Sequence, residues 1–237
     1  MRRLSCLVSG GVARLDSVEW AIVILCAISG GGAGLLACRM LRRCRRPAPV
    51  PAWCCAAGTG LGWAVVAWRR LADGWPAWWF PVPLVVSTLA VPLICADLRH
   101  RRLPDVLTLS AYPVLAVALG AAAVAGPGPG LAVRALLAAL VFGGLHALVR
   151  LAAPAALGGG DVKLACGLGA VLGAVGWAAL PVAAVVAAMG TVLLAAVAVT
   201  RRAATWRDGV PHGPGLLAAT WLVSVFPGAG TEVGMGN

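Results

Sequence analysis

The sequence predicts an all-α polytopic membrane protein, a bundle of about eight transmembrane helices. Of its 237 residues, 61% are hydrophobic and 11% are charged, whereas an average soluble domain has about 25% charged residues. The hydrophobic residues occur in blocks close to the ~20 residues that cross a ~30 Å hydrocarbon layer, and Arg-rich breaks separate the blocks. A soluble enzyme, a disordered tail and a collagen-like fibre are therefore excluded.

Eight apolar blocks are candidate spans. The first follows Arg14; it is too long for a signal peptide and has no clear small-residue cleavage site, so it is kept as a span. The run after Lys163 is too long for one helix even when tilted, so it is divided at Gly176-Trp177, and seven spans remain an alternative. The last block is short and Gly-rich. The predicted spans are residues 18–38, 50–68, 77–96, 105–125, 131–149, 162–178, 180–199 and 213–229.

Residues 1–237 are predicted to form a single integral membrane domain. The longest polar connection has only about a dozen residues, which is too short for a separate soluble domain. No internal repeat is evident, because richness in Ala, Gly and Leu makes any two spans look alike. Small residues in the spans let helices approach closely, so we expect a compact bundle.

The distribution of Lys and Arg predicts the orientation in the membrane. Most of the 19 basic residues lie in alternate connections, and this set belongs in the cytoplasm by the positive-inside rule. Both termini then face outward. The basic connections are residues 39–49, 97–104, 150–163 and 200–212.

The net charge of +11 does not indicate a nucleic-acid partner. The Arg residues cluster at the ends of apolar blocks, where positive charge sets orientation, and no aromatic residues interleave with them to stack on bases. The lipid bilayer is the environment that this charge pattern predicts.

The cysteines do not predict a metal site. The eight Cys include no CxxC pair and no Cys/His cluster at zinc spacing, and most lie in or beside apolar blocks. They are interpreted as small buried hydrophobic residues. We expect neither a metal nor another cofactor.

Acidic residues are few enough to be considered individually. Asp97 ends the apolar run PLICAD at the membrane edge, and Asp161 lies between apolar stretches in ALGGGDVKLACGLG. A carboxylate at such a depth costs several kcal/mol unless it faces a polar cavity or a partner, so both are candidate functional residues. The other acidic residues, apart from Asp105, lie in termini or loops, where a solvated carboxylate is ordinary.

Two carboxylates that reach one membrane face from different helices suggest chemistry with a shared proton. Like charges held a few ångströms apart cannot both ionise cheaply, so the pair holds one protonated and one ionised carboxyl. The ionised partner can activate water while the protonated one polarises a peptide carbonyl. Asp97 and Asp161 could thus hydrolyse an amide without a metal or a covalent intermediate.

Residues beside the two aspartates are predicted to shape the site. Three glycines, Gly158, Gly159 and Gly160, remove side-chain bulk so that a substrate or a second helix can approach Asp161. Pro104 is expected to open the helix that follows it, and Asp105 then acts as a favourable N-terminal charge rather than a catalytic group.

Lys163 and His146 are two further polar residues within the predicted spans. Lys163 could pair with Asp161 or bind the substrate backbone, or it could simply snorkel to the membrane surface. His146 is interpreted as a hydrogen-bonded residue within the fifth span, because no acidic partner lies three or four residues away.

Three segments together resemble the type 4 prepilin peptidase family, the membrane aspartic proteases with a GxGD motif. Residues 96–105, ADLRHRRLPD, resemble the first aspartate segment, in which a Leu-Pro pair follows the Asp after six residues. Residues 158–164, GGGDVKL, match the GxGD segment with its Lys, and residues 210–218, VPHGPGLLA, are similar to a late PFGP segment. A peptidase-like core over residues 90–220 would carry all three.

The resemblance implies an activity and a location. Asp97 and Asp161 would be the catalytic pair of an endopeptidase in the bacterial inner membrane. The substrates and partners would be pilin-like precursors of type IV pili or related secretion systems, whose basic leader is cut on the cytoplasmic side. Cleavage in this family typically follows a Gly just before the hydrophobic helix of the precursor.

Two features depart from the family pattern. Many bacterial members carry an N-terminal cytoplasmic domain with two CxxC pairs that binds zinc and supports N-methylation, and this sequence has no such pairs. We therefore expect peptidase activity without methyltransferase activity. His212 stands where the family often has an aromatic residue.

Two other functions remain as alternatives. A small transporter would use the two aspartates as proton or cation sites, although such sites are expected near the bilayer midplane together with paired repeats. A catalytically inactive membrane scaffold is the other alternative, and the intact aspartates disfavour it.

Overall fold

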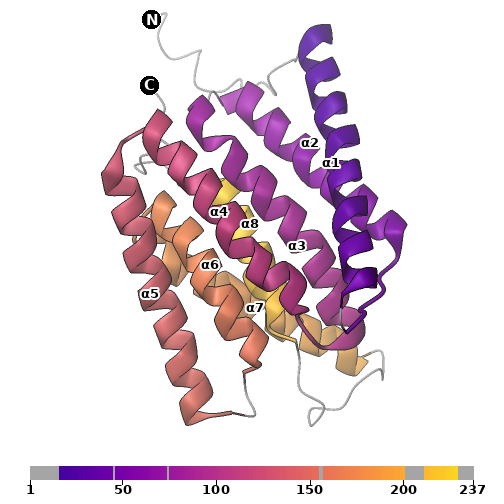
Figure 1. The fold of residues 1–237 in the computed structure, drawn as a ribbon, viewed down its shortest axis with the longest axis vertical. Coiled ribbons are helices and arrows are strands. Elements are labelled where there is room, and N and C mark those ends of the chain that lie inside the picture. The colour runs from indigo at the N-terminus through magenta and orange to yellow at the C-terminus, as the bar shows by residue number, and fades with distance from the viewer. Residues whose placement is uncertain (1–15, 45, 74, 155–156, 201–210, 229–237) are drawn as a thin grey trace, which may run out of the picture.

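The computed structural model describes residues 16–44, 46–73, 75–154, 157–200 and 211–228. These residues form eight α-helices and one short 3-10 helix, with no β-strand among them. The helices are α1 (Ser17–Arg43), α2 (Ala52–Asp73), η1 (Ala77–Trp79), α3 (Pro81–His100), α4 (Asp105–Ala125), α5 (Pro129–Ala152), α6 (Gly159–Val175), α7 (Ala179–Thr200) and α8 (Gly213–Val225). Figure 1 shows them packed as one bundle, in which α3 ends and α4 begins at the same end.

Each predicted span coincides with one α-helix, so the predicted all-α bundle is confirmed. The division of the long apolar run is also confirmed, because α6 ends at Val175 and the Gly176 N–H closes that end on the Leu172 carbonyl at 3.0 Å. The helix ends differ from the predicted ones. α1 continues to Arg43 and α3 to His100, since hydropathy marks only the apolar part of a helix, and basic residues are compatible with its last turn.

Five helical segments are long and apolar enough to cross a membrane: Ser17–Arg43, Ala77–His100, Asp105–Ala125, Pro129–Ala152 and Ala179–Thr200. α8 is a shorter apolar helix. Several such segments in one chain indicate a multi-pass membrane protein.

α6 lies inside the bundle, in contact with α4, α5, α7 and α8. Glycines let it approach α5 closely. A Cβ on Gly173 would overlap Ala138 and lie 2.9 Å from the Arg134 carbonyl oxygen, and a Cβ on Gly169 would lie 2.8 Å from the Phe142 Cβ. Because lipid tails are as apolar as the side chains, such close packing is a main source of helix association in a bilayer.

Two indoles anchor α8 to the rest of the bundle. Trp221 Nε1 donates to Ser87 Oγ on α3 at 2.7 Å, and Trp79 Nε1 donates to the Ser224 carbonyl at 2.9 Å. Trp79 lies near the start of a predicted span, but its side chain is fully buried. It therefore packs and donates a hydrogen bond inside the bundle. These two bonds fix the position of a helix whose first residues belong to the candidate site described below.

The close packing of α5 and α6 gives a prediction about stability. Gly173→Ala places a methyl group against Ala138 and the Arg134 carbonyl, and overpacking of this kind costs about 1–3 kcal/mol. We expect the melting temperature of the detergent-solubilised protein to fall by about 2–10 °C. Differential scanning fluorimetry measures this change.

Gly144→Ala is the matched control on α5, because nothing lies within 4 Å of the added Cβ. Ala is favoured over Gly inside a helix by about 0.5–1 kcal/mol, so this variant should melt at the same temperature or slightly above it. Equal melting temperatures for the two variants would contradict the close α5–α6 contact.

Candidate active site

Asp97 and Asp161 converge at one end of the bundle, beside the start of α8. Asp97 lies in the last turn of α3 and Asp161 in the first turn of α6, and their exposed fractions are 5% and 9%. A Cβ on Gly213 would lie 2.7 Å from Asp97 Oδ2 and 3.2 Å from Asp161 Oδ1. The two carboxyl groups therefore lie beside the same residue of backbone, and its lack of a side chain lets both approach it in these positions.

The chain turns sharply just after Asp97. Arg101 has a left-handed backbone with φ of +50°, and its N–H donates to the Asp97 carbonyl at 2.8 Å, which ends α3. This ending places Asp97 at the C-terminal, electronegative end of a helix.

Asp161 is held by the N-terminal turn of α6. The Gly158 N–H donates to Asp161 Oδ2 at 3.2 Å, as an acidic residue at the third helical position does in a capping arrangement. The other oxygen, Oδ1, is buried and has no hydrogen-bond partner within the part of the chain that the structure describes. A buried polar oxygen left unpaired is costly, and this one lies beside Gly213, as Asp97 Oδ2 also does.

A Cβ added at each of the three glycines before Asp161 would meet a different neighbour, and at Gly158 and Gly160 it would come closer than ordinary van der Waals contact. A Cβ on Gly158 would lie 2.9 Å from Asp161 Oδ2, and one on Gly160 would lie 2.9 Å from the Leu103 Cβ. A Cβ on Gly159 would be 3.4 Å from the Arg150 guanidinium carbon. The sequence predicted room here for a substrate or a second helix; the segment that packs against Gly160 is the connection between α3 and α4, through Leu103.

Pro104 shapes that connection. It is buried and precedes α4 with φ of −66°, and its carbonyl accepts the N–H groups of Leu107 and Thr108 at 3.1 and 3.2 Å. Pro104 is thus the cap residue before the first turn of α4, and it directly follows Leu103, which packs against Gly160 and near Gly213. Its effect on the candidate site is exerted through Leu103.

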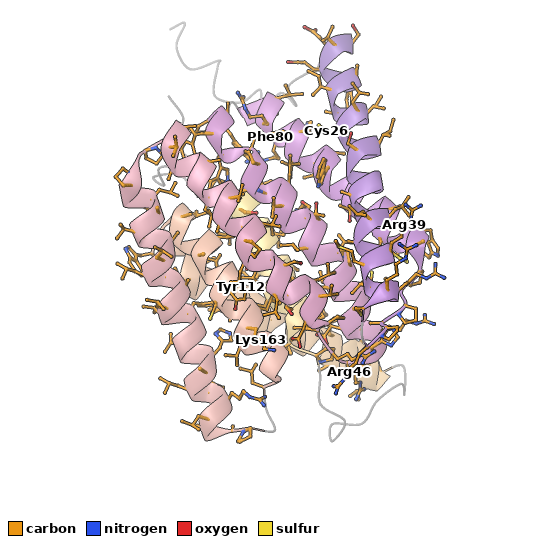
Figure 2. All side chains as sticks on the ribbon, viewed as in Figure 1. Cys26, Arg39, Arg46, Phe80, Tyr112 and Lys163 are labelled. Atoms are coloured by element: carbon orange, nitrogen blue, oxygen red, sulfur yellow. The ribbon has the colours of Figure 1, made fainter. Side chains whose placement is uncertain are left out.

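Lys163 does not pair with Asp161. Its ammonium lies 2.9 Å from Asp105 Oδ1, and both side chains are largely exposed. Tyr112 on α4 also donates its hydroxyl to the Lys163 carbonyl, and Figure 2 shows these two residues near one another between α4 and α6. The reason is geometric: residues two apart on a helix do not share a face, so Lys163 cannot follow Asp161 into the site.

The pairing with Lys163 also gives Asp105 a role. It is the first residue of α4 and occupies the favourable N-terminal turn, as predicted, while its carboxylate binds a cation from α6. An exposed ion pair of this kind contributes at most about 1 kcal/mol. Asp105 is therefore separate from the buried pair of carboxyls.

Two histidines and an arginine approach Asp161, and the sequence did not predict this. The rings of His146 on α5 and His212 before α8 have centroids 6.2 Å apart. Both residues, together with Arg150, interact electrostatically with Asp161. The signal in the sequence is weak, because no acidic residue lies three or four positions from His146 on its own helix, and His212 stands out only by its departure from the family pattern.

Local contacts fix both imidazoles. His146 Nδ1 lies 2.8 Å from the Phe142 carbonyl, and His212 Nδ1 lies 3.1 Å from Thr191 Oγ1 on α7. Burial lowers the pKa of His212, against a smaller opposing effect of Asp161, so the neutral imidazole is favoured near pH 7. Within the described residues, no group of three His, Cys, Asp or Glu side chains could hold a metal ion.

Comparison with known proteins agrees with the motifs. The model of the type IV leader peptidase family matches residues 84–200, a range that contains Asp97, Pro104, Asp161 and Lys163 and ends before the third motif. No curated protein and no solved structure matches the chain. The predicted family resemblance is confirmed. The chain is therefore a multi-pass membrane protein whose residues 84–200 match the type IV leader peptidase family.

Proposed function

We propose that this chain is a membrane aspartic endopeptidase that removes the basic leader from type IV prepilin-like precursors. The observation that carries the proposal is the convergence of the buried Asp97 and Asp161 carboxyls on Gly213. The family match over residues 84–200 supports the reaction class. The position of both aspartates at helix ends favours a peptidase over a transporter, whose ion sites are expected near the bilayer midplane.

The two carboxyls have different electrostatic surroundings, which suggests different roles. Burial disfavours a charge on both carboxyls, but at Asp161 the Gly158 N–H, the positive end of α6 and the nearby Arg150 oppose this effect, so a negative charge is held more easily on Asp161 than on Asp97. Asp97 lies at the negative end of α3 and faces Asp161, so a proton there is favoured. In the proposed ground state Asp161 is ionised and Asp97 is protonated.

Amide hydrolysis then proceeds by general acid and base catalysis. Asp161 accepts a proton from a water molecule as the water oxygen bonds to the scissile carbonyl carbon, while Asp97 donates a hydrogen bond to the carbonyl oxygen. The tetrahedral intermediate collapses as the C–N bond breaks and the leaving nitrogen takes the proton held by Asp161. A carboxylic acid, a free amine and the original protonation of the pair result.

The charge of the bundle end supports cytoplasmic cleavage. Basic residues lie near the end that carries the aspartates, on the last turns of α1, α3 and α5, and the positive-inside rule assigns this end to the cytoplasm. A leader rich in Lys and Arg stays on the same side by the same rule. The bond between that leader and the apolar precursor helix would then lie at the depth of Asp97 and Asp161.

Removal of either carboxyl tests the pair. We expect Asp97→Asn and Asp161→Asn each to lower precursor cleavage by more than about a hundredfold, because one of the two proton-transfer roles is lost. Cleavage is followed by gel shift and mass spectrometry after co-expression with pilin-like precursors, and membrane fractionation verifies insertion. Asp105→Asn is the control; this carboxyl pairs with Lys163 outside the site, so cleavage should change by less than about twofold. Normal cleavage by either catalytic-pair variant would overturn the mechanism.

The variant Gly213→Ala tests whether catalysis requires the Asp97 and Asp161 carboxyls to lie close together. The Cβ of Gly213→Ala would lie 2.7 Å from Asp97 Oδ2, and the flexible carboxyl would have to move away. We expect cleavage to fall by about tenfold or more, with the melting temperature nearly unchanged. Gly144→Ala, with open space around its Cβ, should cleave like the parent chain. Full activity of Gly213→Ala would show that the two carboxyls are not held together during catalysis.

The absence of CxxC pairs from the sequence gives a prediction about the product. We expect the processed precursor to carry a free N-terminal amine when this protein acts alone with S-adenosylmethionine present. Intact-mass measurement of the product separates the free amine from the methylated one. A methylated product made by the purified protein would contradict the proposed activity profile.

A further inference from the structure

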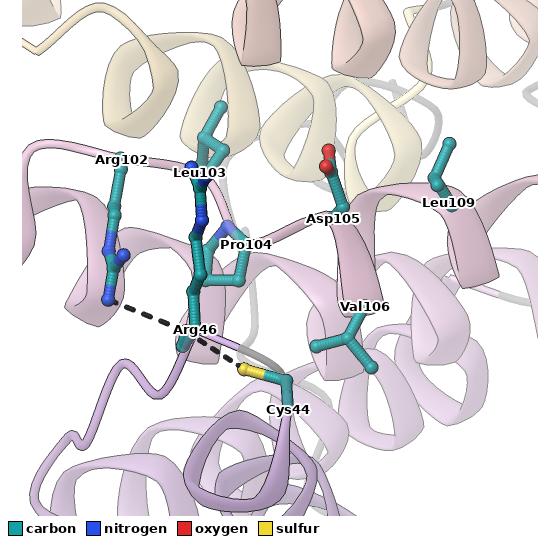
Figure 3. A pocket seen from close by; sticks show the side chains of 8 residues that line it. All are labelled: Cys44, Arg46, Arg102, Leu103, Pro104, Asp105, Val106 and Leu109. Atoms are coloured by element: carbon teal, nitrogen blue, oxygen red, sulfur yellow. Dashed lines mark hydrogen bonds between the residues drawn. The ribbon is translucent and has the colours of Figure 1, made fainter.

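A basic groove lies beside the candidate active site, and neither Asp97 nor Asp161 lines it. Its larger part is a cavity of about 720 Å³ between the α1–α2 connection and the start of α4, lined among others by Arg46, Arg102 and Leu109. Figure 3 shows these side chains around the cavity. A second hollow of about 470 Å³ shares Cys44 and Val106 with the first and continues along α1. We call the two hollows together the basic groove.

Four guanidinium groups line the basic groove. Arg39 and Arg43 come from the last turns of α1, Arg46 from the connection that follows, and Arg102 from the connection before α4; all four are exposed. The lining carboxylate is that of Asp105, and the Lys163 ammonium at 2.9 Å neutralises it. The groove therefore favours an anionic occupant.

The connection that carries Arg46 is held in place by hydrogen bonds. Arg102 Nη2 donates to the Pro47 and Arg46 carbonyls, and Cys44 Sγ donates to the Arg46 carbonyl at 3.1 Å. His100 Nε2 lies 2.9 Å from the Pro49 carbonyl. These contacts join the two basic connections, so the guanidinium groups from α1 and from α3–α4 face one groove.

Part of the lining of the basic groove is apolar and exposed. Leu36 and Met40 on α1 and Leu109 on α4 are 57%, 45% and 51% exposed, and all three line the groove. They lie on helices that are long and apolar enough to span a membrane. A ligand that fits both parts has an anionic head and an apolar tail.

We propose that the basic groove binds an anionic phospholipid, with its phosphate among Arg39, Arg43, Arg46 and Arg102 and its acyl chains against Leu36, Met40 and Leu109. Guanidinium groups match phosphate oxygens in geometry and charge, and basic pockets between membrane helices suit anionic head groups. The basic leader of a precursor would be repelled here, so the groove is not its binding site. Leu103 lines the groove and also packs against Gly160 beside Asp161, so a bound lipid would brace the connection that carries the candidate site.

The test measures lipid binding by the parent protein and by two variants, each of which lacks two arginines. The detergent-solubilised protein is titrated with short-chain phosphatidylglycerol and with phosphatidylcholine of the same chain length, and bound lipid is counted by native mass spectrometry. We expect clear preference for phosphatidylglycerol, and about a tenfold or greater loss of affinity in Arg43→Gln/Arg46→Gln, because each basic residue contributes about one kcal/mol toward an anionic lipid. Arg42→Gln/Arg99→Gln removes two exposed arginines that do not line the groove, and should lose less than about threefold.

Three outcomes would overturn the proposal: equal losses in the two double variants, equal binding of the two lipids, or equal affinity for glycerophosphate without acyl chains. If Arg43→Gln/Arg46→Gln does not fold, the parent protein decides the matter, since phosphatidylglycerol must raise its melting temperature more than phosphatidylcholine does. Asp97→Asn should bind the lipid like the parent chain. Loss of cleavage in that variant with lipid binding retained separates this proposal from the peptidase proposal.

Discussion

The structure depends on keeping two carboxyl groups out of water at a junction of three helices. Burial of a charge is expensive, and two like charges close together are more so unless they share a proton. The arrangement therefore requires that α3, α6 and α8 be held together by contacts elsewhere. Glycines on α6 pack it against α5, and the Trp221–Ser87 and Trp79–Ser224 hydrogen bonds anchor α8. These contacts supply the rigidity that lets Gly213 lie beside both carboxyls.

Small residues serve two purposes in this bundle. On α6 and α5 they allow close approach of helices, which in a bilayer replaces much of the stabilisation that the hydrophobic effect gives a soluble core. At Gly160 and Gly213 they leave room for Leu103 and the carboxyls. The same residue type thus builds the scaffold in the middle of the helices and shapes the candidate site at their ends.

The helices and the two aspartates were predictable from the sequence, whereas most contacts between helices were not. Apolar runs fix the spans, and a carboxylate inside such a run stands out because it is rare and costly. α1 and α3 extend beyond their predicted ends, because the basic residues of a last turn lower the hydropathy although they remain helical. The pairing of Lys163 with Asp105 and the approach of His146 to His212 depend on which faces of distant helices meet, and one sequence gives no measure of that.

The difference between the two carboxyls follows from the topology of the chain. α3 ends at the candidate site, α4 runs away from it and α5 returns, so α6 must begin where α3 ended (Figure 1). One aspartate then lies at a helix C-terminus and the other at a helix N-terminus, where the helix dipoles act on a negative charge in opposite directions. The Gly158 N–H on Asp161 adds to this difference. A pair of identical residues can thereby divide the roles of acid and base, because the fold places them in unequal fields.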